Sequence, residues 1–186
     1  MRIQRFIGLG VLSLSLLTAT AFAQDKAAKQ AEITKSTQAA MERFYKAKPD
    51  LKDAVAKAPG YGIFTTYGVS FIIGGSGGTG IVHDNKTKKS TYMNVGGASA
   101  GLQLGASQTE LLVVFKTPAA MNKFIDKGWE AAGSMTAAAG ASGATAGGGK
   151  GSSAMEDAST YTLTKTGLDV GLAGGISKFW KDKDLN

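Results

Sequence analysis

Glycine-rich segments of this chain carry spacings that resemble nucleotide-binding motifs. Residues 75–80, GSGGTG, fit the G-x-G-x-x-G pattern that holds a dinucleotide pyrophosphate. That site needs a helix directly after the glycines and an acidic side chain about 20 residues later. Here a strand-like Ile-Val pair and a polar turn follow, and no acid occurs between Asp84 and Glu110. The pattern therefore indicates glycine-rich strand sequence rather than a nucleotide site.

Two further segments, 74–78 and 97–101, match the G-x-S-x-G pattern of serine hydrolases. A hydrolase of that type needs an acid and then a histidine later in the chain. The one histidine, His83, precedes the second serine and follows the first by only seven residues. Residues 147–152, GGGKGS, fail as a phosphate loop because a glycine separates the lysine from the serine. We therefore expect no catalytic residues and no enzymatic activity.

The composition excludes most metal and redox sites. The 186 residues include no cysteine and one histidine, so the chain has no disulfide, thiolate cluster or multi-histidine site. We expect no metal and no cofactor. The 26 glycines are about twice the usual share. Because 43% of the residues are hydrophobic, the chain is nevertheless neither collagen-like nor a simple disordered polymer.

The first 23 residues have the three parts of a secretory signal peptide. Arg2 and Arg5 form a positive start, residues 6–17 are apolar, and Ala21 to Ala23 form a small-residue cleavage site. The apolar stretch is shorter than the roughly 20 residues that span a bilayer. We expect cleavage before Gln24 and a soluble periplasmic protein, which is not a lipoprotein because it has no cysteine to acylate.

The chain from Gln24 onward is basic, with 19 lysines and arginines against 14 acids once Arg2 and Arg5 are removed. A moderate positive charge in an exported protein favours anionic lipid headgroups or polyanionic envelope polymers. We expect no nucleic-acid partner, because the compartment disfavours one and no binding-module signature is present.

Helices are predicted first along the chain. Residues 25–48 are rich in Ala, Lys, Gln and Glu, and apolar side chains recur at helical spacing. Pro49 ends this helix, and residues 50–57 form a second, short one before a Pro-Gly turn. A third helix is predicted from Pro118 to about residue 127, with proline in its first turn.

From Tyr61 onward the periodicity is that of strands. Residues 111–115 form an apolar run suited to a strand buried on both faces, and residues 134–146 are compatible with either a strand or a linker. The other strands are predicted over 61–66, 69–74, 79–83, 90–95, 98–106, 160–164, 168–172 and 176–180. The fold class is α+β: N-terminal helices (24–57) packed as one unit on a glycine-rich, mostly antiparallel curved sheet or small barrel (58–186).

The glycine-rich strands resemble, in order and spacing, the SYLF domain, a lipid-binding family. Residues 59–64, PGYGIF, resemble its opening, and residues 71–75 followed by Gly80 resemble its next strands. The most recognisable part is 96–105 with 109–113, and residues 160–175 resemble the closing region. The resemblance covers roughly residues 54–186. It implies binding of phosphoinositides or other anionic phospholipids and, in eukaryotic members, a link to actin.

Two basic features are candidate lipid-binding sites. Family members often carry a basic or aromatic residue where Ser76 to Thr79 stand, so we place the headgroup contacts elsewhere. We predict that Lys86, Lys88 and Lys89 of a polar turn supply attraction, together with Lys35, Arg43 and Lys46 of the first helix. The apolar residues Ile33, Met41 and Phe44 of that helix either contact the membrane or pack in the core.

The sequence thus favours a non-enzymatic protein that binds anionic phospholipids or phosphoinositide-like headgroups at a membrane surface in the cell envelope. One alternative is an envelope-interaction module that binds a protein or a polymer, in which case the protein partner is unknown. A second alternative is a small outer-membrane β-barrel, which the apolar run at 111–115 and the N-terminal helices disfavour.

Overall fold

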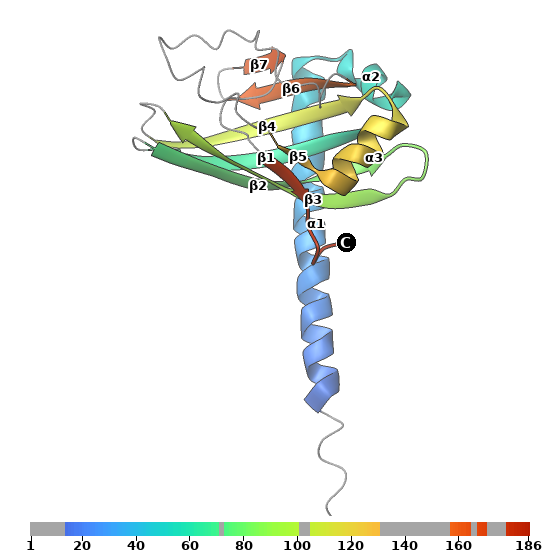
Figure 1. Cartoon of the computed structure of the whole chain (residues 1–186), viewed down its shortest axis with the longest axis vertical. Helices are drawn as coiled ribbons and strands as arrows, with labels where there is room; N and C mark the ends of the chain where they lie inside the picture. Colours follow the sequence, from blue (N-terminus) through green and yellow to red (C-terminus); the bar gives the residue numbers. More distant parts are fainter. Residues whose placement is uncertain (1–13, 71–72, 101–104, 131–156, 165–166, 171–177) are drawn as a thin grey trace, which may run out of the picture.

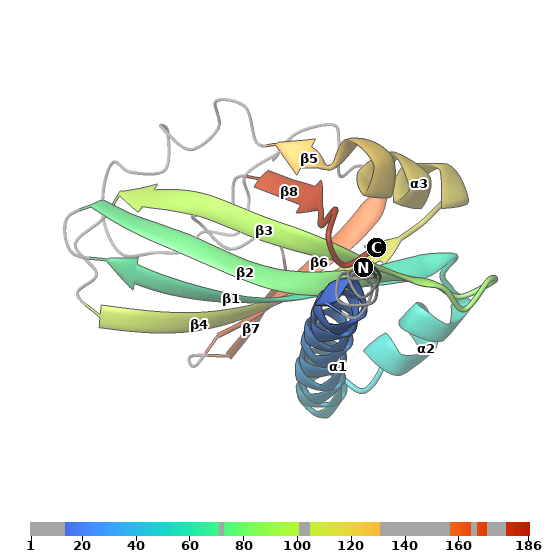
Figure 2. The ribbon, with the colours of Figure 1, turned by 90° about the horizontal axis from the view of Figure 1, so that it is seen from below.

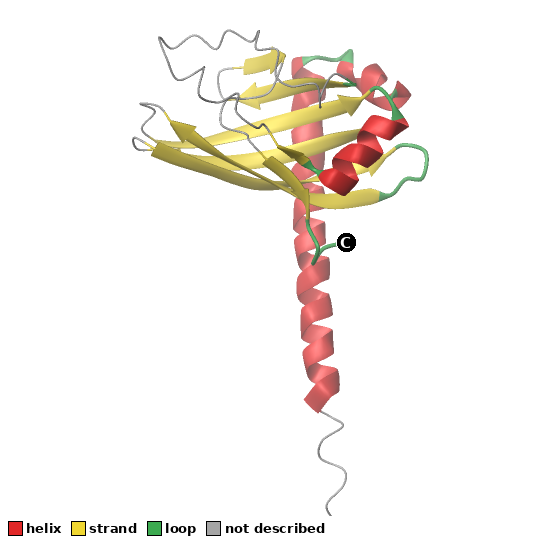
Figure 3. Cartoon of the chain, in the orientation of Figure 1, coloured by secondary structure: helices red, strands yellow, loops and turns green. Residues whose placement is uncertain are grey.

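The computed structural model describes residues 14–70, 73–100, 105–130, 157–164, 167–170 and 178–186 (Figure 1). They form an α+β fold with helices on both faces of one sheet, which confirms the predicted class (Figure 3). The helices are α1 (Leu14–Ala47), α2 (Leu51–Lys57) and α3 (Pro118–Lys127). The strands are β1 (Gly60–Ser70), β2 (Ile73–Asp84), β3 (Ser90–Ala100), β4 (Gly105–Phe115), β5 (Trp129–Glu130), β6 (Ala158–Thr164), β7 (Gly167–Val170) and β8 (Lys178–Lys181).

The eight strands form one sheet in the order β5-β8-β3-β2-β1-β4-β6-β7. Every neighbouring pair is antiparallel. Because β5 and β7 lie at opposite edges, the described strands form an open sheet and not the small barrel that the sequence left as an alternative. The four long strands β1 to β4 make up the centre and extend to one side well past α1 (Figure 2).

The glycine-rich strands are longer than predicted. The separate strands expected at 61–66 and 69–74 are wrong, since β1 runs without a break to Ser70 and β2 begins at Ile73. The single strand expected at 98–106 is also wrong, because its ends belong to β3 and β4. Backbone pairing explains the difference: a glycine N–H and C=O pair in a ladder like those of any other residue, so composition does not mark where a hairpin turns.

The remaining predicted elements agree with the structure where it describes them. The helices at 25–48 and 50–57 correspond to α1 and α2, and the strands at 160–164 and 176–180 to β6 and β8. The two-residue strand β5 was not predicted. The segment 134–146 and residues 1–13 of the predicted signal peptide lie outside the described residues, whereas residues 14–23 continue α1.

Two hydrophobic cores lie on opposite faces of the sheet. On one face Phe44 of α1 packs with Ile63, and on the other Phe124 of α3 packs with Phe64. β1 and β4 serve both cores because successive side chains of a strand point to opposite faces. Residues 111–115 are each at most 8% exposed, which confirms the prediction of a strand buried on both sides.

The third helix begins and ends at residues suited to those positions. The Thr117 hydroxyl accepts a hydrogen bond from the Ala120 N–H at 3.1 Å, and Pro118 occupies the first turn. The helix ends at Gly128, whose φ of 66° is a conformation that glycine adopts without strain. These signals explain why the sequence predicts α3 at its observed position.

The C-terminus is attached to both α1 and β3. Leu185 is buried in the α1-side core, and its carbonyl accepts a hydrogen bond from Gln30 Nε2 at 2.7 Å. The Asn186 side chain bonds both the N–H and the C=O of Tyr92, so it extends the ladder where β8 has ended. Figure 1 shows the chain end beside α1. These contacts hold the helix against the sheet.

Substitution by alanine should affect stability differently at two glycines of β2. A Cβ at Gly80 would fall on the Ile63 carbonyl oxygen and lie 2.8 Å from Phe64 Cα, whereas a Cβ at Gly77 meets nothing within 4 Å. We expect Gly80→Ala to lower the free energy of unfolding by about 2 kcal/mol. Gly77→Ala should leave it unchanged or raise it by up to about 0.5 kcal/mol, because alanine loses less backbone entropy on folding. Urea unfolding of both variants measures the difference, and equal destabilisation would contradict it.

Candidate functional site

A cluster of exposed lysines lies at one end of the sheet, and the turn between β2 and β3 organises it. Asp84 Oδ1 accepts hydrogen bonds from the backbone N–H of Lys86 at 2.8 Å and of Thr87 at 3.1 Å. These bonds lower the pKa of the Asp84 carboxyl, so it stays ionised and holds the turn closed. Lys88 has a φ of 60°, the left-handed conformation that closes the turn.

Asn85 attaches this turn to α2. Its side-chain Nδ2 donates to the Val55 carbonyl at 2.7 Å and to the Ala58 carbonyl at 2.8 Å. Its backbone N–H donates to the Pro59 carbonyl at 3.0 Å. Asn85 thereby satisfies carbonyls at the C-terminal end of α2, which the helix itself leaves unpaired.

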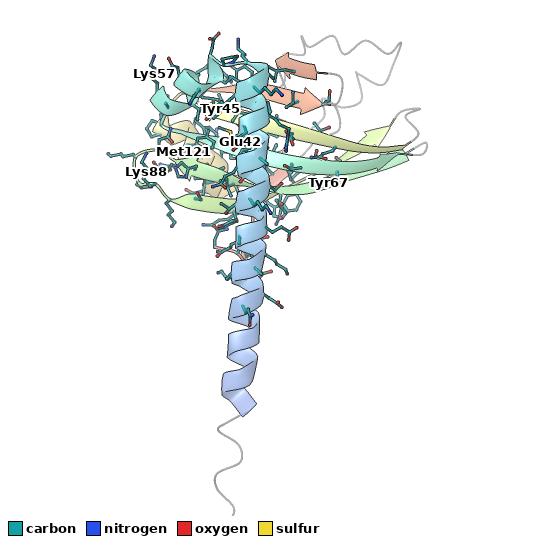
Figure 4. The ribbon with its side chains drawn as sticks, turned by 180° about the vertical axis from the view of Figure 1, so that it is seen from behind. Glu42, Tyr45, Lys57, Tyr67, Lys88 and Met121 are labelled. Carbon is teal, nitrogen blue, oxygen red and sulfur yellow. The ribbon has the colours of Figure 1, made fainter. Side chains whose placement is uncertain are left out.

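This attachment brings α2 and the β2–β3 turn to one surface. The exposed lysines of α2 lie at the same end of the molecule as those of the turn, as Figure 4 shows for Lys57 and Lys88. We call the set the basic end; its members are Lys52, Lys57, Lys86, Lys88 and Lys89.

Nearby acids neutralise little of the basic end. Lys57 Nζ lies 3.9 Å from Asp53 Oδ2, but both side chains are more than 80% exposed, and such pairs are weak. Within the described residues, no ion pair involves Lys86, Lys88 or Lys89. The three ammonium groups of the turn are therefore available to an anionic ligand.

The sequence predicted the turn lysines and missed those of α2. Lys52 and Lys57 lie about thirty positions before the turn, and nothing in their spacing indicates that Asn85 joins the two segments. Lys35 and Lys46 are exposed on α1. They belong to a different element from the turn lysines with which the sequence grouped them.

Arg43 has a structural partner that the sequence did not indicate. Its Nε lies 2.9 and 3.0 Å from the two carboxylate oxygens of Glu110 on β4, and its Nη2 also contacts that carboxylate. The hydrogen bond to Glu110 raises the pKa of the Arg43 guanidinium. The Glu110 side chain is 5% exposed and the Arg43 side chain 48%. Because this pair compensates much of the charge of Arg43, we do not count Arg43 in the basic end, and its role in attracting lipid stays a prediction.

The three predicted membrane-contact residues lie in the core. Ile33 and Met41 are each 8% exposed and Phe44 is fully buried, all against the sheet. If α1 left the sheet for a membrane, the sheet residues that these three cover, among them Ile63 and Leu112, would be exposed to water at a cost of about 2 kcal/mol for each side chain. Core packing, the alternative that the sequence left open, is the arrangement in this structure.

His83 is a cross-strand partner of Ser90. Its Nδ1 lies 2.9 Å from Ser90 Oγ, and its ring centroid lies 5.4 Å from that of Tyr61. Burial, followed by the positive charge of Lys88, lowers the pKa of His83. No group of three His, Cys, Asp or Glu side chains among the described residues could hold a metal ion.

Comparison with known proteins places these features in a family. Residues 96–186 match the family model Ysc84, described as "Las17-binding protein actin regulator". Over 166 residues the chain is 32% identical to Beta cell expansion factor A of Aeromonas veronii, a match that covers 86% of this chain and 60% of the relative. The chain belongs to the SYLF (Ysc84) family. It spans less than two thirds of the length of this curated relative.

The matched region of this SYLF chain begins within β3 and includes β4, α3 and β8. The turn lysines lie just before it, on the β2–β3 hairpin. No helix in the described part of the chain is long and apolar enough to span a bilayer.

The Arg43–Glu110 pair predicts a non-additive effect on stability. Arg43→Met should lower the free energy of unfolding by about 2 kcal/mol, because it leaves a buried carboxylate without its cation. Adding Glu110→Gln should recover at least half of that loss, since the amide is neutral. A double-mutant cycle from urea unfolding measures the coupling, and additive losses would contradict it.

The lowered pKa of His83 predicts a loss of stability on mild acidification. The unfolded chain takes up a proton near pH 6.5, before the native chain does, so the free energy of unfolding falls as the pH drops from about 7.5 to about 5.5. His83→Gln retains a hydrogen-bonding partner for Ser90 but does not titrate. The free energy of unfolding of this variant should therefore change less across this pH window, as measured by urea unfolding at each pH. If it falls as steeply as that of the unmodified chain, His83 is not the cause of the pH dependence.

Proposed function

We propose that this chain binds anionic phospholipid at a membrane surface, without enzymatic chemistry, through the basic end. The observation that carries the proposal is the gathering of five exposed lysines from two elements by the hydrogen bonds of Asn85. Near an anionic membrane each lysine contributes about 1 kcal/mol, so five give about 5 kcal/mol, a weak and salt-sensitive affinity. Membership of the SYLF family supports a lipid ligand, and phosphoinositide-like headgroups are one class of it.

The protein can bind a membrane either with α1 packed on the sheet or with α1 inserted. The lysines attract an anionic surface whether or not α1 leaves the sheet. Insertion of Ile33, Met41 and Phe44 would instead uncover apolar sheet residues such as Ile63 and Leu112, at about 2 kcal/mol for each side chain left in water. We therefore propose adsorption of the folded domain, with α1 still packed on the sheet. The signal-peptide pattern of residues 1–23 supports a periplasmic location, where the membrane surfaces of the envelope offer anionic lipid.

A protein ligand is the second candidate, because the matching family model is described as a Las17-binding protein. Capture of a protein from envelope extracts by the full chain, together with absence of vesicle binding, would favour this candidate over the first.

The lipid proposal predicts that neutralising the turn removes vesicle binding. The variant Lys86→Gln/Lys88→Asn/Lys89→Gln removes three charges, and asparagine at position 88 tolerates the positive φ. Loss of about 3 kcal/mol should weaken binding to phosphatidylglycerol-containing vesicles about a hundredfold at low salt. Flotation of the full chain with phosphatidylcholine vesicles, with and without phosphatidylglycerol, measures the effect.

A matched variant separates local from total charge. Lys29→Gln/Lys181→Gln/Lys183→Gln also removes three positive charges from exposed positions on α1, β8 and the C-terminal segment. It should retain most of the binding. Equal losses in both variants, or equal binding to neutral vesicles, would refute a role for the basic end.

A further inference from the structure

Two exposed aromatic side chains stand on the α1 face of the sheet, at the side opposite the basic end. Tyr67 is 61% exposed and Trp180 is 42% exposed, and they are the large hydrophobic residues exposed within the described chain. Figure 4 shows Tyr67 on one side of α1 and Lys88 on the other. The aromatic pair is therefore a surface separate from the basic end.

The strand register places these rings on either side of β2. Tyr67 of β1 pairs with Gly77 of β2, and Gly77 pairs with Gly96 of β3. The Trp180 ring reaches over Gly96, because a Cβ there would lie 3.2 and 3.3 Å from the indole carbons Cη2 and Cζ3. A single strand, β2, thus separates the two aromatic groups.

The floor between the rings has no side chains to fill it. A Cβ on Gly75 or Gly77 meets nothing within 4 Å, and both residues are exposed. Adjacent strands lie about 4.8 Å apart, so β1 and β3 are about 10 Å apart across this floor. A ring that stacks on an aromatic face lies about 4 Å from it, so the space above β2 is about as wide as one ring. We call this feature the aromatic slot.

The neighbouring helix restricts what reaches the slot. Ser36 Oγ of α1 lies 3.5 Å from Thr65 Oγ1 of β1. Thr65 is two residues before Tyr67, on the same face of the strand. An α-helix is about 10 Å across, so α1 rises about that far above the sheet on the same face. A flat bilayer that rests on α1 therefore does not touch the floor of the slot, whereas a narrow chain lying beside the helix does.

The backbone of the floor favours a sugar over a peptide. β2 is paired on both sides, with β1 and with β3, so its N–H and C=O groups are used in the two ladders. A peptide lying on the floor would bury its own polar groups without partners. A pyranose ring instead presents C–H groups to the aromatic rings and directs its hydroxyls sideways, toward Thr79 on the floor and toward solvent. We propose that the aromatic slot binds a pyranose ring of a glycan chain.

The test is a titration of the full chain with soluble hexamers of β-1,4-linked glucose and β-1,4-linked N-acetylglucosamine. At concentrations up to about 10 mM, which detect millimolar affinity, the backbone amide signals of Gly75, Gly77 and Gly96 should shift. The exposed Trp180 should change fluorescence while the buried Trp129 does not. Absence of shifts with both hexamers would overturn the proposal.

Two kinds of variant make the test specific. Tyr67→Ala and Trp180→Ala should each weaken binding about fivefold, the value of one aromatic stacking contact. Gly77→Val fills the floor at a position with open space, so it should keep the fold, as its urea unfolding will show, and abolish the shifts. Persistent binding in Gly77→Val would refute the slot.

The basic end supplies the matched control. Lys86→Gln/Lys88→Asn/Lys89→Gln should bind the hexamers as the unmodified chain does, whatever its behaviour with vesicles. If Tyr67→Ala and Trp180→Ala instead abolish vesicle binding and leave hexamer binding unchanged, the slot is a membrane contact and the glycan proposal fails. Shifts produced by unrelated extended peptides and not by the hexamers would also overturn it.

Discussion

The packing of β1 and β4 is the constraint on which the rest of the structure depends. These two strands are apolar on both faces: Ile63, Phe64, Leu111 and Leu112 are all fully buried. A strand pair of this kind at the centre of a sheet is stable only if both faces are covered. α1 covers one face and α3 the other, and each helix contributes a phenylalanine to its core. The positions of the helices follow from this requirement.

The position of α1 in turn divides the sheet into two halves with different surfaces. On one side of the helix, the β2–β3 turn and α2 meet through Asn85 and gather the lysines of the basic end. On the other side, the long strands continue beyond the helix (Figure 2) and leave the glycine floor and its two aromatic side chains uncovered by any described element. α1 is therefore a partition between a charged surface and an uncharged one, and it needs to remain packed for either surface to keep its shape.

Polar contacts fix the position of α1 along the sheet. Arg43 reaches Glu110 on β4, Ser36 lies near Thr65 on β1, and Gln30 bonds the Leu185 carbonyl at the C-terminus. The three contacts are spaced along the helix and reach three different elements. A hydrophobic interface alone tolerates small slips of a helix along a sheet, whereas an ion pair with a buried carboxylate does not, because displacement leaves that carboxylate without its cation. The same pair engages the guanidinium of Arg43, whose side chain is 48% exposed.

Much of the local structure could be predicted from the sequence, because capping residues, prolines and apolar runs act on their immediate neighbours. Thr117-Pro118 and Gly128 mark the ends of α3, Pro49 ends the first helix, and the apolar run 111–115 indicates a doubly buried strand. The glycine-rich strands were divided wrongly because glycine carries no side-chain period, and only pairing with a partner defines their ends.

What the sequence by itself determined is the α+β class, the SYLF resemblance and the lysine-bearing turn, since each depends on residue types and spacings within a few tens of positions. Only the tertiary structure decided that Ile33, Met41 and Phe44 face the core, that Arg43 belongs to Glu110, and that Lys52 and Lys57 join the turn. It also brought Tyr67 and Trp180 to the two sides of one strand, although 113 positions separate them in the chain. The physical reason is the same in every case: an amphipathic helix or a long strand specifies that it must be covered, but its partner is chosen by packing and hydrogen bonding between segments far apart in the sequence.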